Sequence, residues 1–464
     1  MKTYGNASQG VPDVRTANNR KVGRNIVLRL LLSGALAATT LSPDILLFAQ
    51  GPRAGERWVG AWATAVMLRQ PTPPAGGAVG QAPAPALASA INLDNQTLRQ
   101  IIHVSLGGDQ VRVVFSNAYG TAPLEIGAAS VALRATDAAI KPQSARALMF
   151  GGRPGASIPP GALLVSDPAR LTVPALADVA VDLHLPGRTE GQPVTVHGAA
   201  WQTSYVSRTG NFSGASSFPV QTTTDFMRAQ LPSASWFFLS RVEVVAPAQT
   251  GAVVALGDSI TDGTQSGINT NNRWPDHLAR RFARSNIKMG VLNVGIGGNR
   301  VLADGTGTGI SALARFDRDV LAQPGVTHVI LFEGINDIQG PPPNPSAEEL
   351  IAGHRQIIER AHTHGLKIYG ATLTPFRGWT SFSDEREAKR QAVNQWMRTA
   401  KMYDAVIDFD AVVRDPKDPS KMRAEFDPGD HLHMNGVGYK AMADAIDLAL
   451  FKSGSAVVQT TTER

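Results

Sequence analysis

The spacing of apolar residues divides the chain into two regions with different patterns. From about residue 56 to residue 247, short segments rich in β-branched and aromatic residues alternate apolar with polar positions, and turn residues separate them. The clearest predicted strands are residues 110–115, 179–185, 194–201 and 236–245. Strands at this spacing indicate an antiparallel β-sandwich, jelly-roll-like in topology, over residues 56–247.

After residue 248 the pattern changes to short apolar runs separated by longer segments of helical spacing. The predicted strands are residues 252–256, 291–294, 326–332, 366–373 and 405–409. The predicted helices are residues 275–285, 311–322, 347–364, 384–401 and 436–451. Apolar strands that alternate with helices indicate an α/β fold with a parallel sheet covered on both faces, here over residues 250–452. Ligands of such sheets bind beyond the carboxyl ends of the strands, so functional residues should follow the strands.

The two ends of the chain differ from these regions. Within residues 1–50, basic residues precede an apolar run that is followed by small residues, which is the pattern of an export signal. The alternative is an uncleaved membrane anchor, but Pro43 and Asp44 interrupt the apolar stretch. We therefore expect a secreted or periplasmic protein without a stable membrane span after processing. Residues 453–464 are expected to form a polar tail.

Composition excludes several classes of function. The chain has 464 residues and is 43% hydrophobic, which is enough to bury a substantial core and excludes global disorder. It contains no cysteine, so disulfides, zinc–thiolate sites and cysteine nucleophiles are excluded together. Most of the net charge of +6 comes from the first fifty residues, which hold six basic and two acidic side chains. The remaining chain is nearly neutral, and this argues against a nucleic-acid partner.

Two loops that follow predicted strands carry the residues of a serine nucleophile and its base. Ser259 lies at a strand-to-helix turn, where its hydroxyl would be exposed at the edge of the sheet. A serine hydroxyl needs a base at neutral pH. Asp430 and His433 stand three residues apart before the last helix, so the carboxylate can hold one imidazole nitrogen while the other faces the serine. His431 is a rival base, but the Asp-x-x-His spacing favours His433.

Two further loops carry groups that could stabilise an oxyanion. The loop after the second strand holds the pair Gly297 and Gly298, and the loop after the third holds Asn336. A backbone N–H freed by glycine and an asparagine amide, placed beside the N–H of Ser259, would form an oxyanion hole.

Four segments in order resemble the signature blocks of the SGNH (GDSL-type) hydrolases: GDSIT at 257–261, NVGIGGN at 293–299, GIND at 334–337 and DHLH at 430–433. The resemblance implies a flavodoxin-like doubly wound sheet over residues 250–452. It also implies that Ser259 is the nucleophile, that Asp430 and His433 complete a triad, and that Ser259, Gly298 and Asn336 form the oxyanion hole. The β-rich region is similar to that of exported two-domain members. Because two glycines adjoin in the second block, the glycine assignment could shift by one residue, and the spacing from Asn293 favours Gly298.

The sequence therefore predicts an exported serine ester hydrolase that works through an acyl-enzyme. The favoured substrates are carbohydrate O-acetyl esters or other short-chain acyl esters, either small molecules or acylated polysaccharides. The alternatives are a lipase- or thioesterase-type acyl hydrolase, an O-acetyltransferase, or a carbohydrate-binding protein with a decayed hydrolase domain. No metal or organic cofactor is expected, because the serine mechanism requires none. His362 and His364 resemble a pair of metal ligands but lack a third ligand nearby in the sequence.

Overall fold

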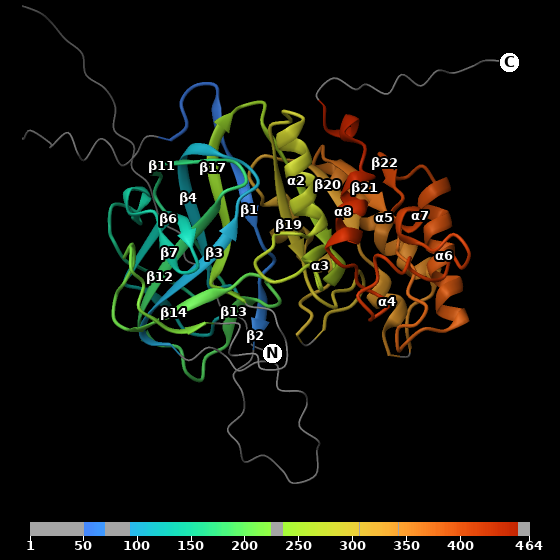
Figure 1. The fold of residues 1–464 in the computed structure, drawn as a ribbon, viewed down its shortest axis with the longest axis horizontal. Coiled ribbons are helices and arrows are strands. Elements are labelled where there is room, and N and C mark those ends of the chain that lie inside the picture. Colours follow the sequence, from blue (N-terminus) through green and yellow to red (C-terminus); the bar gives the residue numbers. More distant parts are fainter. Residues whose placement is uncertain (1–50, 70–92, 224–234, 306, 342, 453–464) are drawn as a thin grey trace, which may run out of the picture. The chain divides into compact units, whose positions relative to one another are not determined.

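The structure is a computed structural model that describes residues 51–69, 93–223, 235–305, 307–341 and 343–452 (Figure 1). The predicted export segment, residues 1–50, and the predicted polar tail, residues 453–464, lie outside the described residues. Within the described ranges no helix is both long enough and apolar enough to cross a membrane.

The β-rich region, coloured blue to green in Figure 1, is built from antiparallel strands. One sheet consists, in spatial order, of β1 (Glu56–Ala63), β17 (Leu239–Pro247), β4 (Gly108–Ser116) and β10 (Leu163–Val165), with β11 (Ala169–Val173) also paired to β4. A larger sheet consists of β15 (Val220–Thr223), β14 (Ser204–Thr209), β3 (Asp94–His103), β12 (Asp178–Arg188), β6 (Ala128–Thr136) and β7 (Ala139–Ile140), with β8 (Arg146–Leu148) paired to β6. Smaller sheets are formed by β16 (Trp236–Phe237), β13 (Val194–His197) and β2 (Met67–Arg69), and by β5 (Leu124–Ile126) with β9 (Ala156–Ile158).

Two of the predicted strands in this region differ from the structure for the same reason. The predicted strand 194–201 ends at His197, because Ala199 and Trp201 have φ values of 58° and 49°. The predicted strand 236–245 is interrupted at Phe238, whose φ is 55°, and is therefore split into β16 and β17. Extended backbone requires negative φ, so residues in the left-handed region interrupt the regular geometry of a strand at these two places.

The second region, yellow to red in Figure 1, contains a five-stranded parallel sheet. Its spatial order is β19 (Met289–Gly295), β18 (Gly251–Gly257), β20 (Val326–Phe332), β21 (Lys367–Ala371) and β22 (Ala405–Ile407). Every residue of β18 is buried, as expected for a strand covered on both faces. The helices are α1 (Ser259–Asp262), α2 (Trp274–Arg284), α3 (Ala312–Phe316), α4 (Ile335–Gln339), α5 (Ala347–Thr363), α6 (Asp384–Thr399), α7 (Phe409–Val413) and α8 (Gly436–Asp444).

Helix α5 illustrates how the local sequence determines where a helix begins and which of its faces is buried. Ser346 and Glu349 form the capping box that their spacing predicts, with each side chain accepting from the other residue's backbone N–H at 3.1 and 2.8 Å. The buried face includes Leu350, Ile357 and Ile358, whose spacing follows one side of a helix. Where the sequence predicts one helix over residues 311–322, α3 continues as a single π-helical turn, Asp317–Leu321.

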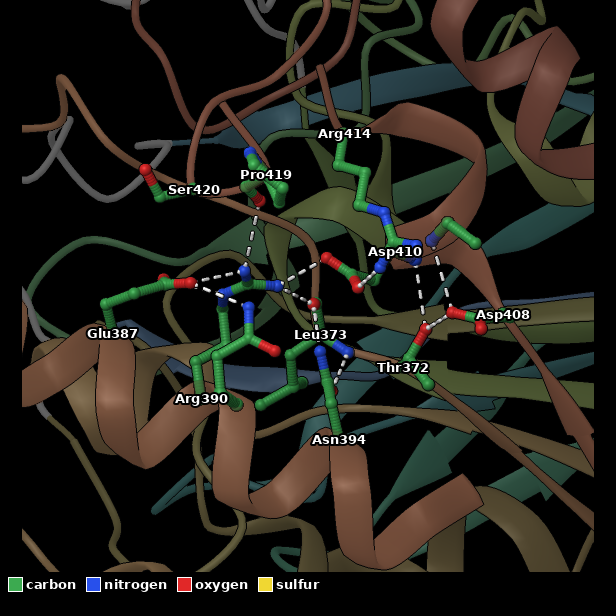
Figure 2. Close-up of polar contacts among 12 residues, drawn as sticks. Thr372, Leu373, Glu387, Arg390, Asn394, Asp408, Asp410, Arg414, Pro419 and Ser420 are labelled. Atoms are coloured by element: carbon green, nitrogen blue, oxygen red, sulfur yellow. Dashed lines mark hydrogen bonds and ion pairs between the residues drawn. The ribbon is translucent and has the colours of Figure 1, made fainter. Parts of the chain in front are cut away.

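A network of buried ion pairs and hydrogen bonds lies beyond the carboxyl end of β21 (Figure 2). The fully buried side chain of Arg390, on α6, pairs with Asp410 at 2.6 Å and with Glu387 at 2.6 Å, and it donates to the carbonyl of Leu373 at 2.7 Å. Asp410 is also fully buried and accepts from Arg414. These contacts compensate the buried charge of Arg390, which would strongly destabilise the fold if it were unpaired, and they join α6 to α7 and to the segment after β21.

The two regions share one continuous hydrophobic core. Strand β1 contacts β19, the edge strand of the parallel sheet. The N–H of Gly60 donates to the carbonyl of Pro324 at 2.9 Å, and the N–H of Val291 donates to the hydroxyl of Ser105 at 2.8 Å. The β-rich region is therefore joined to the parallel sheet by backbone hydrogen bonds as well as by apolar packing.

Candidate active site

Ser259 lies two residues after the end of β18, at the first position of the one-turn helix α1. The preceding residue, Asp258, is the N-cap, and its carboxylate accepts from the N–H of Ile260 at 2.9 Å. As the first residue of a helix, Ser259 has a backbone N–H without an intrahelical acceptor. The buried turn thus presents both a hydroxyl and a free N–H at the carboxyl edge of the sheet.

The structure brings Ser259, His433 and Asp430 into one hydrogen-bonded line. His433 Nε2 lies 2.9 Å from Ser259 Oγ, and His433 Nδ1 lies 2.8 Å from Asp430 Oδ2. The other oxygen of Asp430 accepts from the backbone N–H groups of Leu432 and His433, at 3.0 and 2.9 Å. These are the contacts that the Asp-x-x-His spacing predicts. They can orient the imidazole so that it receives a proton from the serine hydroxyl.

The charge of Asp430 is stabilised by its partners. Partial burial alone would raise the pKa of this carboxyl, but the hydrogen bonds from His433, the charge of His433 and the backbone N–H groups outweigh burial and lower the pKa to about 2. Asp430 therefore remains ionised through the range in which histidine titrates. An ionised carboxylate at this position favours a positively charged imidazole, which is the state that forms when His433 accepts a proton.

The rival histidine, His431, has a different partner. Its Nδ1 lies 2.6 Å from Asp427 Oδ2, its side chain is about half exposed, and its φ is 63°. The neighbouring histidines thus form separate pairs with separate aspartates, and it is His433 whose second nitrogen contacts Ser259.

Gly298 and Asn336 flank the strand end from two neighbouring loops. Gly298 has a φ of 75° in a turn that the N–H of Asn299 closes on the carbonyl of Ile296 at 3.1 Å. A Cβ at this position would lie 2.6 Å from a methyl carbon of Thr308, whereas a Cβ at Gly297 would meet nothing closer than 4.0 Å. Gly298 is therefore the member of the pair that requires glycine.

Asn336, in α4, ties its loop to this turn. Its side-chain amide donates to the carbonyl of Asn299 at 3.0 Å. The next residue, Asp337, accepts from the N–H groups of Val301 and Leu302 at 2.8 and 3.0 Å. The loops after β19 and β20 are thus held together by side chains of the GIND segment.

Arg315 is a component of the site that the sequence analysis missed. This fully buried side chain donates to the carbonyls of Val294 and Gly257, at 2.6 and 3.0 Å, and to the side-chain oxygen of Asn299 at 2.9 Å. It thereby fixes the carboxyl ends of β18 and β19. No local pattern in the sequence indicates this role, because these three partners of Arg315 lie 16 to 58 positions away.

Three carboxyl groups lie buried beneath the site. Burial, with a further contribution from the charge of Asp337, raises the pKa of Asp258 to about 7. Burial likewise raises the pKa of Asp337 to about 6 and that of Glu333 well above its usual value. Arg315 lies 3.8 Å from Glu333, which is too far for a hydrogen bond. These groups favour their protonated forms at mildly acidic pH.

Trp379 is a second residue that the sequence analysis did not identify. Its ring lies edge-on to the ring of His433, with the centroids 6.0 Å apart. The side chain is partly buried and comes from the loop that follows β21. It places an aromatic surface beside the proposed base.

The described residues contain no group of three or more His, Cys, Asp or Glu side chains placed to hold a metal ion. His362 lies 3.0 Å from Asp404, and His364 contacts the carbonyl of Arg360 at 2.9 Å. A small cavity of about 30 Å³ lies between the β-rich region and the parallel sheet, lined by residues that include His197, Asp262 and Asn293. Neither Ser259 nor His433 lines this cavity.

Residues 255–441 match the model of the GDSL-like lipase/acylhydrolase family. This segment is a GDSL-like lipase/acylhydrolase domain, as its four motifs indicate, and the chain is a carboxylic ester hydrolase. No curated protein gives a significant match to the chain.

Solved structures are similar to less than half of the chain. A protein of the G-D-S-L family from Desulfitobacterium hafniense is 25% identical, with 42% of this chain and 96% of that chain covered and a TM-score of 0.33. A GDSL-like lipase from Bacteroides thetaiotaomicron is 19% identical over 43% and 87% of the chains, with a TM-score of 0.33. A carbohydrate acetylesterase family member from Sinorhizobium meliloti is 15% identical over 43% and 97%, with a TM-score of 0.35. The classification as an ester hydrolase rests on the family match and not on the likeness to these structures.

Proposed function

We propose that this ester hydrolase is an exported serine esterase that forms an acyl-enzyme at Ser259. The observation that carries the proposal is the continuous line of hydrogen bonds from Asp430 through His433 to Ser259. The strand order of the parallel sheet supports a doubly wound, flavodoxin-like arrangement, in which ligands bind at the carboxyl edge where this line lies.

The chemistry follows from the geometry. His433 Nε2 accepts the proton of the Ser259 hydroxyl as Oγ attacks the ester carbonyl, and Asp430 stabilises the imidazolium that forms. His433 then donates that proton to the leaving alcohol, which departs as the acyl-enzyme forms. In the second half-reaction a water molecule, deprotonated by the same imidazole, attacks the acyl-enzyme and restores the serine.

The negative charge of each tetrahedral intermediate falls on the former carbonyl oxygen. We assign the N–H of Ser259, the N–H of Gly298 and the side-chain amide of Asn336 as its three donors. Asn336 uses one amide hydrogen on Asn299, and the second hydrogen stays available for the substrate oxygen. Donors held in advance by such contacts need no rearrangement when charge develops.

For the substrate, we propose short-chain acyl esters, above all the O-acetyl esters of carbohydrates. Two features support this choice. The sequence pattern of residues 1–50 favours export, which would place the enzyme among extracellular polysaccharides. Trp379 presents an aromatic surface beside His433, where the alcohol part of an ester would leave.

A screen of p-nitrophenyl esters of increasing chain length, together with acetylated xylan and pectin, tests the substrate. The proposal predicts the highest kcat/KM for acetyl esters and release of acetate from at least one polysaccharide. An optimum on long acyl chains would contradict it and favour a lipase-type enzyme. Product analysis with an added acceptor sugar separates hydrolysis from acetyl transfer, since a transferase forms the acetylated acceptor in place of free acetate.

A further inference from the structure

A histidine of the β-rich region contacts the helix that carries Ser259. His197, at the end of β13, places its Nε2 3.0 Å from Asp262 Oδ1, and Asp262 is the last residue of α1. Both side chains are almost fully buried. The contact joins residues that are 65 positions apart and that belong to different regions of the fold.

We propose that His197 is a positioning residue for the esterase: through Asp262 it fixes the turn that carries the Ser259 hydroxyl. This inference rests on the proposed function, because it assumes that Ser259 is the nucleophile. It assigns to the β-rich region a part in the catalytic site, in addition to any ligand that the region binds by itself.

The hydrogen-bond partners of His197 fix its orientation. Its Nδ1 lies 2.8 Å from the carbonyl oxygen of Ala65, which can only accept, so Nδ1 carries a hydrogen. Nε2 is then the nitrogen that faces the Asp262 carboxylate, 3.0 Å from Oδ1. The ring also lies near Trp236, with the centroids 5.5 Å apart. His197 is therefore held from the β-rich side and has one nitrogen left for Asp262.

Asp262 depends on this contact. Among the described residues its second oxygen, Oδ2, has no hydrogen-bond partner, so the bond with His197 is what orients the carboxylate. Its backbone N–H donates to the carbonyl of Asp258 at 2.8 Å, which closes the turn around Ser259. A displacement of Asp262 would therefore be transmitted directly to α1.

Helix α1 also packs closely against β19. A Cβ at Gly295, the last residue of β19, would lie 2.3 Å from the backbone nitrogen of Asp262, so the turn packs against bare backbone. Asn293 donates its side-chain amide to the carbonyl of Thr261 at 2.7 Å. Strand β19 and His197 thus both contact the turn that carries Ser259.

Further hydrogen bonds join the segment after β13 to the loop that follows α1. The carbonyl of Trp201 accepts from the N–H of Asn269 at 2.9 Å, and the side-chain oxygen of Asn269 accepts from the N–H of Thr203 at 2.7 Å. Arg273 donates to the carbonyl of Ala200. The segment after β13 therefore holds the loop that follows α1, and His197 is the contact in this series that reaches α1 itself.

Two substitutions of the same residue separate the two bonds of His197. The amide nitrogen of His197→Gln stands near the place of Nε2 and can still donate to Asp262. The amide nitrogen of His197→Asn stands near the place of Nδ1 and can still donate to Ala65. Each variant keeps one hydrogen bond and loses the other, so both should lose similar thermal stability.

If His197 positions the turn that carries Ser259, the two variants should differ in kcat. His197→Asn should lower kcat on the order of 10- to 100-fold, with KM changed much less, because a displaced nucleophile slows the chemical step. His197→Gln should retain most of the wild-type kcat. The rate at which a fluorophosphonate labels Ser259, measured on folded protein, should follow the same order.

A matched control is His184→Asn. His184 is a buried histidine of the same region whose Nε2 contacts Asn95 at 2.9 Å, within the β-rich sheets. We expect this variant to keep wild-type kcat and labelling rate. The inference is overturned if His197→Asn also keeps both, or if His197→Asn and His197→Gln lose them equally. If Ser259 of the wild-type protein is not labelled at all, it is the proposed function that fails.

Discussion

The side-chain amide of Asn336 donates to the backbone carbonyl of Asn299, with the two atoms 3.0 Å apart. This bond ties the loop after β20 to the turn that contains Gly298. Both sides of the proposed oxyanion hole are thereby held in place before substrate binds, and one amide hydrogen of Asn336 remains for the substrate.

The first prediction concerns this amide. Asn336→Ala should lower kcat by about 10²–10³-fold while KM changes much less, because the bond to the oxyanion strengthens only in the transition state. Asn336→Asp should fold and be at least as inactive, since its carboxylate would face the developing negative charge. Steady-state kinetics on a soluble acetyl ester measures both variants. A stable Asn336→Asp enzyme with near-normal kcat would remove Asn336 from the mechanism.

The adjacent glycines allow a matched comparison. Gly298→Ala should lose most of its activity, because its φ of 75° is strained for alanine and a methyl group would collide with Thr308. Gly297→Ala meets open space and should keep its activity to within about tenfold, since nothing in the turn must move. Kinetics at equal fractions of folded protein, checked by circular dichroism, makes the comparison. If Gly297→Ala were the more impaired of the two, the second oxyanion donor would have to be reassigned.

Alanine substitutions of His433 and His431, the two histidines of the loop before α8, should also differ in their effect on kcat. His433→Ala should lower kcat by about 10⁴-fold or more, because nucleophile and base act as one unit. His431→Ala breaks the contact with Asp427 but removes no contact to Ser259, so kcat should fall less than about tenfold. The same acetyl ester assay applies. Equal losses in two folded variants would leave the choice of His433 as base without support.

Asp258 gives a prediction about stability and pH. Its pKa is raised to about 7 by burial, so the folded state keeps this proton after the unfolded chain has released it near the usual value of 3.8. Between about pH 4 and pH 7 the folded state therefore binds more protons, and its contribution to the free energy of unfolding falls as pH rises. Above about pH 7 the contribution is constant.

Asp258→Asn tests this, because the asparagine cannot ionise but can still accept from the N–H of Ile260. Denaturant unfolding at several pH values gives the free energy of unfolding of each protein. The wild-type value minus the variant value should decrease between about pH 4 and pH 7 and then level off. Parallel curves for the two proteins would mean that Asp258 titrates at an ordinary pKa.

Much of the catalytic geometry could be predicted because it is local or follows from the fold class. Asp430 and His433 are three residues apart, so a turn alone brings their side chains together. Ser259 follows β18, so it lies at the carboxyl edge of the sheet, where the ligands of parallel sheets bind. Strand β20 is found where the apolar run predicts it, at Val326–Phe332.

The remainder depends on contacts between distant residues and on backbone conformation. Arg315 reaches the ends of β18 and β19 and the turn at Asn299, and His197 reaches α1, yet neither stands in a local pattern that identifies a partner. The breaks at Ala199 and Phe238 come from positive φ values in residues that ordinarily favour helix or strand. Tertiary packing imposes such values, and a sequence of one protein does not indicate them.

The most direct test of the account is to find which serine becomes acylated. A fluorophosphonate should modify the wild-type protein at one site, and peptide mapping by mass spectrometry should locate the adduct on Ser259. Ser259→Ala should fold, remain unlabelled and lose activity by several orders of magnitude. An adduct on another serine, or labelling and ester hydrolysis that persist in folded Ser259→Ala, would contradict the proposal that Ser259 is the nucleophile.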